Sequence, residues 1–99
     1  MLPAQVKKEF RGELLCFLYD IHPLSISLTS IYQTYFQYWK TEDIDKILEY
    51  LVEKGYVEEE TVQPPNTMFE TVRRFKITPA GIDLLDGTIE DPGVLIVRR

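Results

Sequence analysis

Residues that carry most enzyme chemistry are scarce in this chain. It has one cysteine, Cys16, and one histidine, His22, among 99 residues. A single cysteine excludes a disulfide within the chain and fits a reducing compartment, so we expect a cytoplasmic protein. Neither residue stands at a spacing typical of metal ligands, and there is no glycine-rich phosphate loop. We therefore predict a protein that is not an enzyme and that uses no cofactor or metal.

Long apolar runs are also missing. No run approaches the ~20 residues that a membrane helix needs. The N-terminal sequence MLPAQVKKEF lacks the apolar centre of a secretory signal. The apolar fraction of 44% is nevertheless ordinary for a globular protein. We expect a single folded domain with no membrane partner.

Positive charge is the third shortage. The chain has 11 lysines and arginines against 16 aspartates and glutamates, a formal net charge of −5. Proteins that bind duplex DNA gain much of their affinity from lysine and arginine at the phosphates. An acidic chain must gather its positive residues on one surface to bind DNA, so the composition argues mildly against nucleic acid.

The first half of the chain has the spacing of helices. Apolar residues from Val6 to Ile21 recur every three or four positions, which predicts a helix from about Pro3 to His22. We expect residues 25–28 to form a short strand or extended link. A second helix, IYQTYFQYW at 31–39, would be capped by Thr29 or Ser30.

A third helix is the most regular feature of the sequence. In TEDIDKILEYLVEKG, residues 41–55, Thr41 is the expected cap and Gly55 the expected end. Its apolar side is formed by Ile44, Ile47, Leu48 and Leu51. Its other positions carry five acidic and two basic residues between 42 and 54, namely Glu42, Asp43, Asp45, Lys46, Glu49, Glu53 and Lys54.

The pattern then changes to that of strands. Residues 56–63 and 68–77 predict a β-hairpin whose turn is centred near Pro65 and Asn66. This turn would place Glu58 opposite Arg73 and Arg74, where opposite charges stabilise a strand pair. Phe69, Phe75 and Ile77 would share the buried side of the second strand. A short helix follows, capped by Thr78 and ended by Gly87, with Ile82 and Leu85 facing inward.

We expect one hydrophobic core to unite these elements. The residues that should be buried in it are Phe10, Leu14, Leu18, Ile44, Ile47, Leu48, Leu51, Phe75, Ile77 and Leu85.

This order of elements resembles a winged helix-turn-helix domain. The segment ILEYLVEKGYVEEE is similar to the end of a winged-helix third helix that runs into the wing, and FKITPAGIDLLDG is similar to the segment that follows the wing in many bacterial members. DPGV at 91–94 also resembles small winged-helix proteins encoded in Mu-like prophages. The resemblance implies an α+β winged-helix domain over residues 1–87, followed by an extended C-terminal tail at 88–99.

The resemblance also implies a regulator that binds DNA. In helix-turn-helix domains the third helix enters the major groove, but here that helix is acidic, so the contacts would have to come from helix one and the wing. The candidate residues are Lys7, Lys8 and Arg11 of helix one and Arg73, Arg74 and Lys76 of the wing, with Lys46 as the one candidate on the third helix. The wing arginines fit two interpretations equally well, namely contacts to DNA and salt bridges to the glutamates at 58–60.

The alternative is a protein-interaction module that binds no DNA. The second helix is rich in aromatic residues, and tyrosine and tryptophan are enriched in protein interfaces. The tail carries an apolar VLIV segment, which we expect to form an extended strand against its own wing or that of a second subunit. A homodimer or another protein partner would follow from this. The candidate contact residues are Tyr32, Tyr38, Trp39, Val94, Leu95, Ile96 and Val97.

Overall fold

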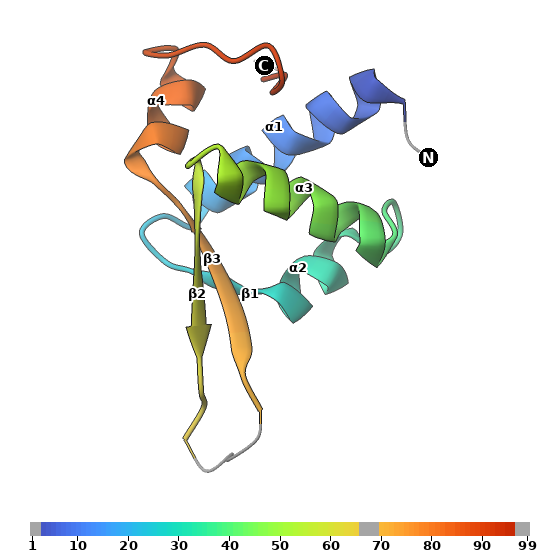
Figure 1. The fold of residues 1–99 in the computed structure, drawn as a ribbon, viewed down its shortest axis with the longest axis vertical. Helices are drawn as coiled ribbons and strands as arrows, with labels where there is room; N and C mark the ends of the chain where they lie inside the picture. The colour runs from blue at the N-terminus through green and yellow to red at the C-terminus, as the bar shows by residue number, and fades with distance from the viewer. Residues whose placement is uncertain (1–2, 66–69, 97–99) are drawn as a thin grey trace.

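The computed structural model describes residues 3–65 and 70–96. Within these ranges the chain forms four helices and one three-stranded antiparallel sheet (Figure 1), which confirms the mixed α+β class. The elements are α1 (Ala4–Asp20), β1 (Ile26–Ser27), α2 (Leu28–Tyr35), α3 (Thr41–Glu53), β2 (Val57–Val62), β3 (Val72–Ile77) and α4 (Pro79–Asp86). None of the described helices is long and apolar enough to cross a membrane.

The sheet has the strand order β1-β3-β2, so β3 is central. In the β2–β3 hairpin Glu58 pairs with Lys76, and Glu60 pairs with Arg74. The expected position of Glu58 opposite Arg73 and Arg74 is therefore wrong. The observed register is shifted by two to three residues from the expected one, so that Glu60 and not Glu58 faces Arg74. Phe69, which we predicted to be buried, lies outside the described residues.

Two helix starts also differ from the prediction. Helix α2 begins at Leu28, and its cap is Ser27, whose side chain accepts a hydrogen bond from the backbone N–H of Ser30. The earlier start is possible because the strand before it has only two residues. In α3, Thr41 is the first helical residue and Lys40 is the cap position, without a side-chain cap bond.

Other boundaries agree with the sequence. Gly55 follows α3 with a φ of 82°, a left-handed conformation that glycine adopts without steric cost. Thr78 caps α4 by accepting from the backbone N–H of Gly81, and Gly87 ends the helix with a φ of 87°.

The core lies where α1, α3 and the sheet meet. Of the ten residues that we predicted to be buried, Leu85 alone is only half-buried, and Leu84 of α4 is buried instead. Trp39, a predicted contact residue, stacks on buried Phe10 with ring centroids 4.1 Å apart. Helix α3 thus directs its apolar row into the core, as its spacing predicted.

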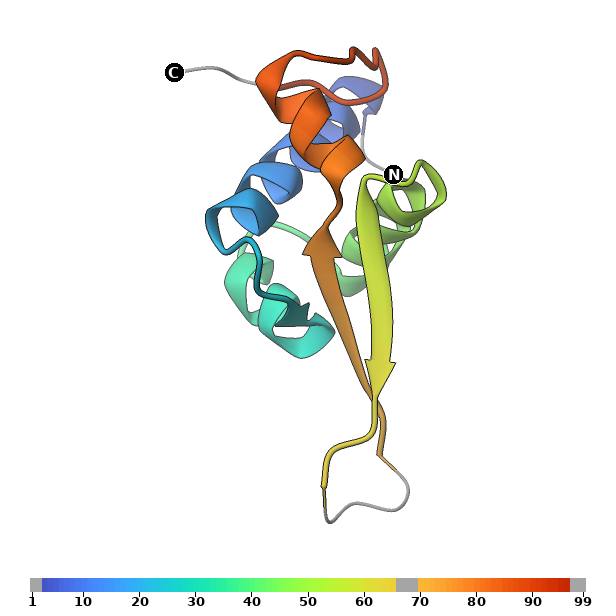
Figure 2. The same cartoon turned by 90° about the vertical axis from the view of Figure 1, so that its left-hand side faces the viewer.

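In the described part of the tail, residues 94–96 do not form the expected strand. Residues 91–96 cross α1 (Figure 2), and the backbone N–H of Leu95 donates to the carbonyl of Lys8 over 3.0 Å. Val94 is buried in the core, whereas Leu95 remains 37% exposed. The described part of the tail therefore packs on a helix of its own domain and not on a sheet. Val97 lies outside the described residues.

Candidate interaction surfaces

The exposed side of α3 is acidic. Opposite its buried apolar row, we define the α3 surface as the exposed residues Glu42, Asp45, Lys46, Glu49 and Glu53. The hydroxyl of Tyr32 donates to the carboxylate of Asp45, which couples α2 to this surface. Burial of Tyr32, together with the bond to Asp45, raises the pKa of its hydroxyl to about 12. Lys46 is thus the single positive side chain in an otherwise negative set.

Two cations of the β2–β3 hairpin are paired with glutamates. Nη2 of Arg73 lies 2.7 Å from Oε1 of Glu59, and this hydrogen bond is the main reason that the pKa of Arg73 is raised. Nζ of Lys76 lies 3.6 Å from Oε2 of Glu58, its cross-strand neighbour. The salt-bridged interpretation of the hairpin thus describes these two side chains in the free protein.

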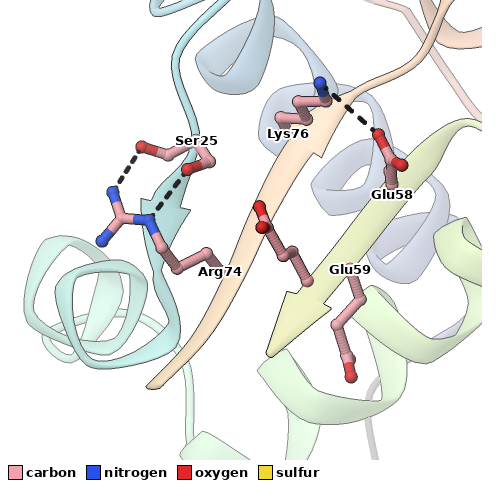
Figure 3. Close-up of a pocket in the computed structure, with 6 residues that line it drawn as sticks. Ser25, Glu58, Glu59, Arg74 and Lys76 are labelled. Carbon is pink, nitrogen blue, oxygen red and sulfur yellow. Dashed lines mark hydrogen bonds and ion pairs between the residues drawn. The ribbon is translucent and has the colours of Figure 1, made fainter. Parts of the chain in front are cut away.

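Arg74 has a different partner (Figure 3). Its Nε donates to Oγ of Ser25, and its Nη2 donates to the carbonyl of Ser25, both over 2.8 Å. Ser25 precedes β1, so the guanidinium fastens this linker to the central strand. A 360 Å³ pocket on this face of the sheet is lined by Ser25, Glu58, Glu59, Glu60, Arg74 and Lys76. Three glutamates of β2 thus stand beside two cations of β3, so most of the charge is balanced.

Four lysines, two on α1 and two at or near the start of α3, are less constrained. Lys7, Lys8, Lys40 and Lys46 form no ion pair with any described residue. A 540 Å³ depression between α1 and α3 is lined by Lys7, Arg11, Lys40, Glu42, Asp43, Lys46 and Ile47. Two carboxylates therefore stand among these positive groups.

Arg11 is directed into the molecule. Its Nη1 donates to the carbonyl of Gly93 over 2.9 Å, and its guanidinium carbon lies 3.7 Å from the ring centroid of Tyr50. Its Nε is buried without a hydrogen-bond partner in the described part of the chain. Arg11, one of the predicted DNA contacts, thus holds the tail against α1 and α3.

Asp91 is the second anchor of the tail. It accepts hydrogen bonds from the Tyr56 hydroxyl over 2.6 Å and from the Gly93 backbone N–H over 2.7 Å, and its Oδ2 lies 3.3 Å from Nζ of Lys54. Burial alone would raise the pKa of Asp91, but these donors outweigh it and the pKa is lowered. The hydrogen bond to Asp91 raises the pKa of the Tyr56 hydroxyl to about 12, and burial of the hydroxyl contributes to the same shift. We call Arg11, Tyr50, Lys54, Tyr56 and Asp91 the tail clasp.

A groove of about 670 Å³ runs along the side of α1, and we call it the α1 groove. Its lining residues are Glu9, Gly12, Glu13, Cys16, Phe17, Asp20, Tyr35 and Leu95. The rings of Phe17 and Tyr35 meet edge to face with centroids 5.9 Å apart. The described lining holds three exposed carboxylates and no lysine or arginine.

The three aromatic residues predicted as protein contacts differ in how far they are buried. Trp39 is partly buried and packs against the core, Tyr32 is half-buried, and Tyr38 is 76% exposed. Phe36, which was not among the predicted contacts, is 68% exposed and lies in the turn that follows α2. The sequence signal for the α1 groove, also missed, is the spacing of Glu9, Glu13 and Asp20 along one helix.

Metal ligands do not gather in the described residues, where no group of three or more histidine, cysteine, aspartate or glutamate side chains could hold an ion. Comparison of the chain with models of known families, with curated proteins and with solved structures gives no significant match. The candidate surfaces therefore have to be interpreted from their own geometry.

Proposed function

We propose that this chain is a winged-helix domain that acts as a protein-interaction module. The order of helices and strands and the β1-β3-β2 sheet support the winged-helix interpretation. In that arrangement β1 follows the first helix and pairs with the second strand of the wing. The β2–β3 hairpin is then the wing, and α3 holds the position that reads DNA in helix-turn-helix domains.

The charge of α3 carries the functional part of the proposal. The α3 surface has four carboxylates around Lys46. Phosphates line both edges of the major groove, so an acidic helix there meets repulsion along its length. Acidic residues in the first turn also stabilise the helix through its dipole, which gives Glu42 and Asp43 a role without any ligand.

The wing adds little positive charge to compensate. Arg73 and Lys76 are paired with glutamates, and Arg74 binds Ser25. To reach a phosphate, each would have to give up a contact within its own domain. Exposed Phe36 and Tyr38 offer apolar and aromatic area of the kind that protein interfaces use. A protein partner therefore suits the surface better than a duplex.

DNA binding through helix one is the second candidate. Lys7, Lys8, Lys40 and Lys46 are free of ion pairs among the described residues, and three of them line one depression. A transcription regulator of the prophage type would use these lysines as contacts to the phosphate backbone. Glu42 and Asp43 in the same depression oppose this use.

A salt series separates the two candidates. Fluorescence anisotropy with a mixed-sequence duplex gives the association constant at several salt concentrations. For a protein-interaction module we expect weak binding and a slope near zero in log K against log salt. A slope of about −3 or steeper would mean that several phosphates are neutralised, and it would favour DNA binding. Replacing Lys7, Lys8, Lys40 and Lys46 by glutamine should then remove that slope.

A further inference from the structure

We propose that the α1 groove binds a basic amphipathic segment of a partner protein. This inference rests on the proposed function, because it names the surface and the partner chemistry of the interaction module. The described lining of the groove combines apolar side chains with three exposed carboxylates and contains no lysine or arginine. That combination specifies an occupant with an apolar anchor and flanking lysine or arginine.

The floor of the groove comes from three elements. Cys16 and Phe17 of α1 are half-buried, Tyr35 of α2 is 7% exposed, and Leu95 of the tail also lines the groove. Gly12 is buried beside them, because the backbone of Leu95 occupies the space that a side chain there would fill. An apolar side chain placed here would remove partly exposed carbon from water on both sides.

The rim explains which occupant fits. Glu9, Glu13 and Asp20 stand along α1 and are all exposed. They extend over about 17 Å of helix at 1.5 Å per residue. Negative charge from Glu13 and Asp20, after burial itself, also contributes to raising the pKa of the Tyr35 hydroxyl. A cationic segment would meet three carboxylates that form no ion pair with any described residue.

Gly12 and the tail keep the groove in shape. A methyl group at Gly12 would overlap the carbonyl of Leu95, so the tail lies directly on the helix at this point. The tail clasp then fixes the chain before Leu95 through Arg11 and Asp91. The tail segment that lines the groove is therefore held in place by contacts on both sides of Pro92.

The probe is a synthetic peptide of about 14 residues, long enough as a helix to cover the rim. It carries leucine at helical spacing and lysine on both flanks, and a matched peptide carries glutamate in place of lysine. Titration calorimetry measures the affinity of each for the whole chain. We expect the lysine peptide to bind and the glutamate peptide to show no measurable binding.

Two triple variants locate the binding site. Glu9→Lys, Glu13→Lys and Asp20→Lys together should weaken the lysine peptide by about tenfold or more, because three attractive contacts become repulsive. Glu42→Lys, Glu49→Lys and Glu53→Lys on the α3 surface change the net charge equally and should alter the affinity by less than about threefold. Equal losses in both variants would overturn the proposal, because the peptide would then respond to net charge alone. Circular dichroism checks that both variants fold.

Cys16 supplies a readout independent of charge. It is the single cysteine of the chain and lines the groove floor. A bound peptide should slow its reaction with a neutral maleimide by about fivefold or more, since access to the thiol governs the rate. An unchanged rate at saturating peptide would place the peptide elsewhere and overturn the proposal.

Two other occupants would also overturn it. If a chain ending at Ile96 bound the peptide more than tenfold tighter than the full chain, the occupant would be the chain's own C-terminal residues. If the free protein sedimented as a dimer that the α1 triple variant disperses, the occupant would be a second copy. If the lysine peptide does not bind and the protein does not bind DNA either, only the proposed role of the α1 groove is overturned. A steep salt dependence of DNA binding would instead overturn the proposed function itself.

Discussion

The α1 groove and the α3 surface are both acidic, yet they differ in what lies beside the charges. The acids of α3 stand on a regular helix whose apolar row is already buried in the core. Those of α1 flank side chains that remain partly open to water, such as Cys16 and Phe17. The acidic residues of α1 therefore have partly exposed apolar side chains beside them, which is why we propose a partner for the α1 groove and not for the α3 surface.

The largest expected effect tests whether the structural role of α3 lies on its buried side. Leu48 is 2% exposed, and Leu48→Ala should lower the free energy of unfolding by about 2–5 kcal/mol through lost burial and a cavity. Its exposed neighbour gives the control, because Glu49→Gln should change stability by less than about 0.5 kcal/mol. Urea unfolding measures both, and similar losses would mean that the faces of α3 are assigned wrongly.

The α1 side can be tested at Gly12. Gly12→Ala should destabilise the chain by about 1–3 kcal/mol, since the added methyl group overlaps the Leu95 backbone. In a chain ending at residue 90 the same substitution should instead stabilise α1 by up to about 1 kcal/mol, because alanine favours helix over glycine. A penalty of equal size in both chains would show that the tail is not its cause.

The tail clasp should respond to pH at both ends of the scale. The lowered pKa of Asp91 contributes stability that is present above its unfolded pKa of about 4 and is lost as the pH falls through the lower folded value. The raised pKa of Tyr56 contributes stability below about 10 that is lost as the pH rises through about 12.

Asp91→Asn tests the acid side of this window. It should cost about 1–3 kcal/mol at pH 7, where the carboxylate accepts charged and neutral donors. The difference from the unmodified chain should shrink as the pH falls below 4, because the unfolded chain then takes up a proton at Asp91 that the folded chain, with its lower pKa, takes up only at lower pH. Thermal unfolding from pH 3 to 8 gives the curve, and a constant difference would contradict the assigned role of Asp91.

The smallest expected effect is on the hairpin. Arg73→Ala should cost no more than about 1 kcal/mol, because its ion pair with Glu59 is exposed and screened by salt. If Arg73 contacted phosphate, its loss would also make the DNA salt slope shallower by about one unit. Measuring both quantities on one variant tells a surface ion pair from a DNA contact.

Much of the fold could be predicted because it depends on local pattern. The spacing of Ile44, Ile47 and Leu48 identifies the buried side of α3, and Thr78 and Gly87 mark the ends of α4. The register of the hairpin could not be predicted, because it depends on where the connection closes. Short-range signals also failed for α2, whose cap is Ser27 and not Thr29 or Ser30.

The candidate surfaces were harder to predict because they join distant residues. Arg11 contacts Gly93, which is 82 positions away, so nothing near Arg11 indicates that it is committed to the tail. The apolar tail residues predicted an extended strand, and the tail instead crosses α1, where Gly12 leaves room for it. The aromatic residues at 35–39 predicted a helix that continues to residue 39. Helix α2 instead ends at Tyr35, and Phe36 in the turn that follows is exposed.

The central claim is that the α3 surface and the wing do not form a DNA interface. Backbone amide chemical shifts, recorded during titration with a mixed-sequence duplex at about 50 mM salt, where phosphate contacts are strong, test it residue by residue. We predict no saturating shifts at Lys46, Arg73, Arg74 or Lys76. Saturating shifts that group on α3 and the β2–β3 hairpin, and that vanish at high salt, would contradict the claim.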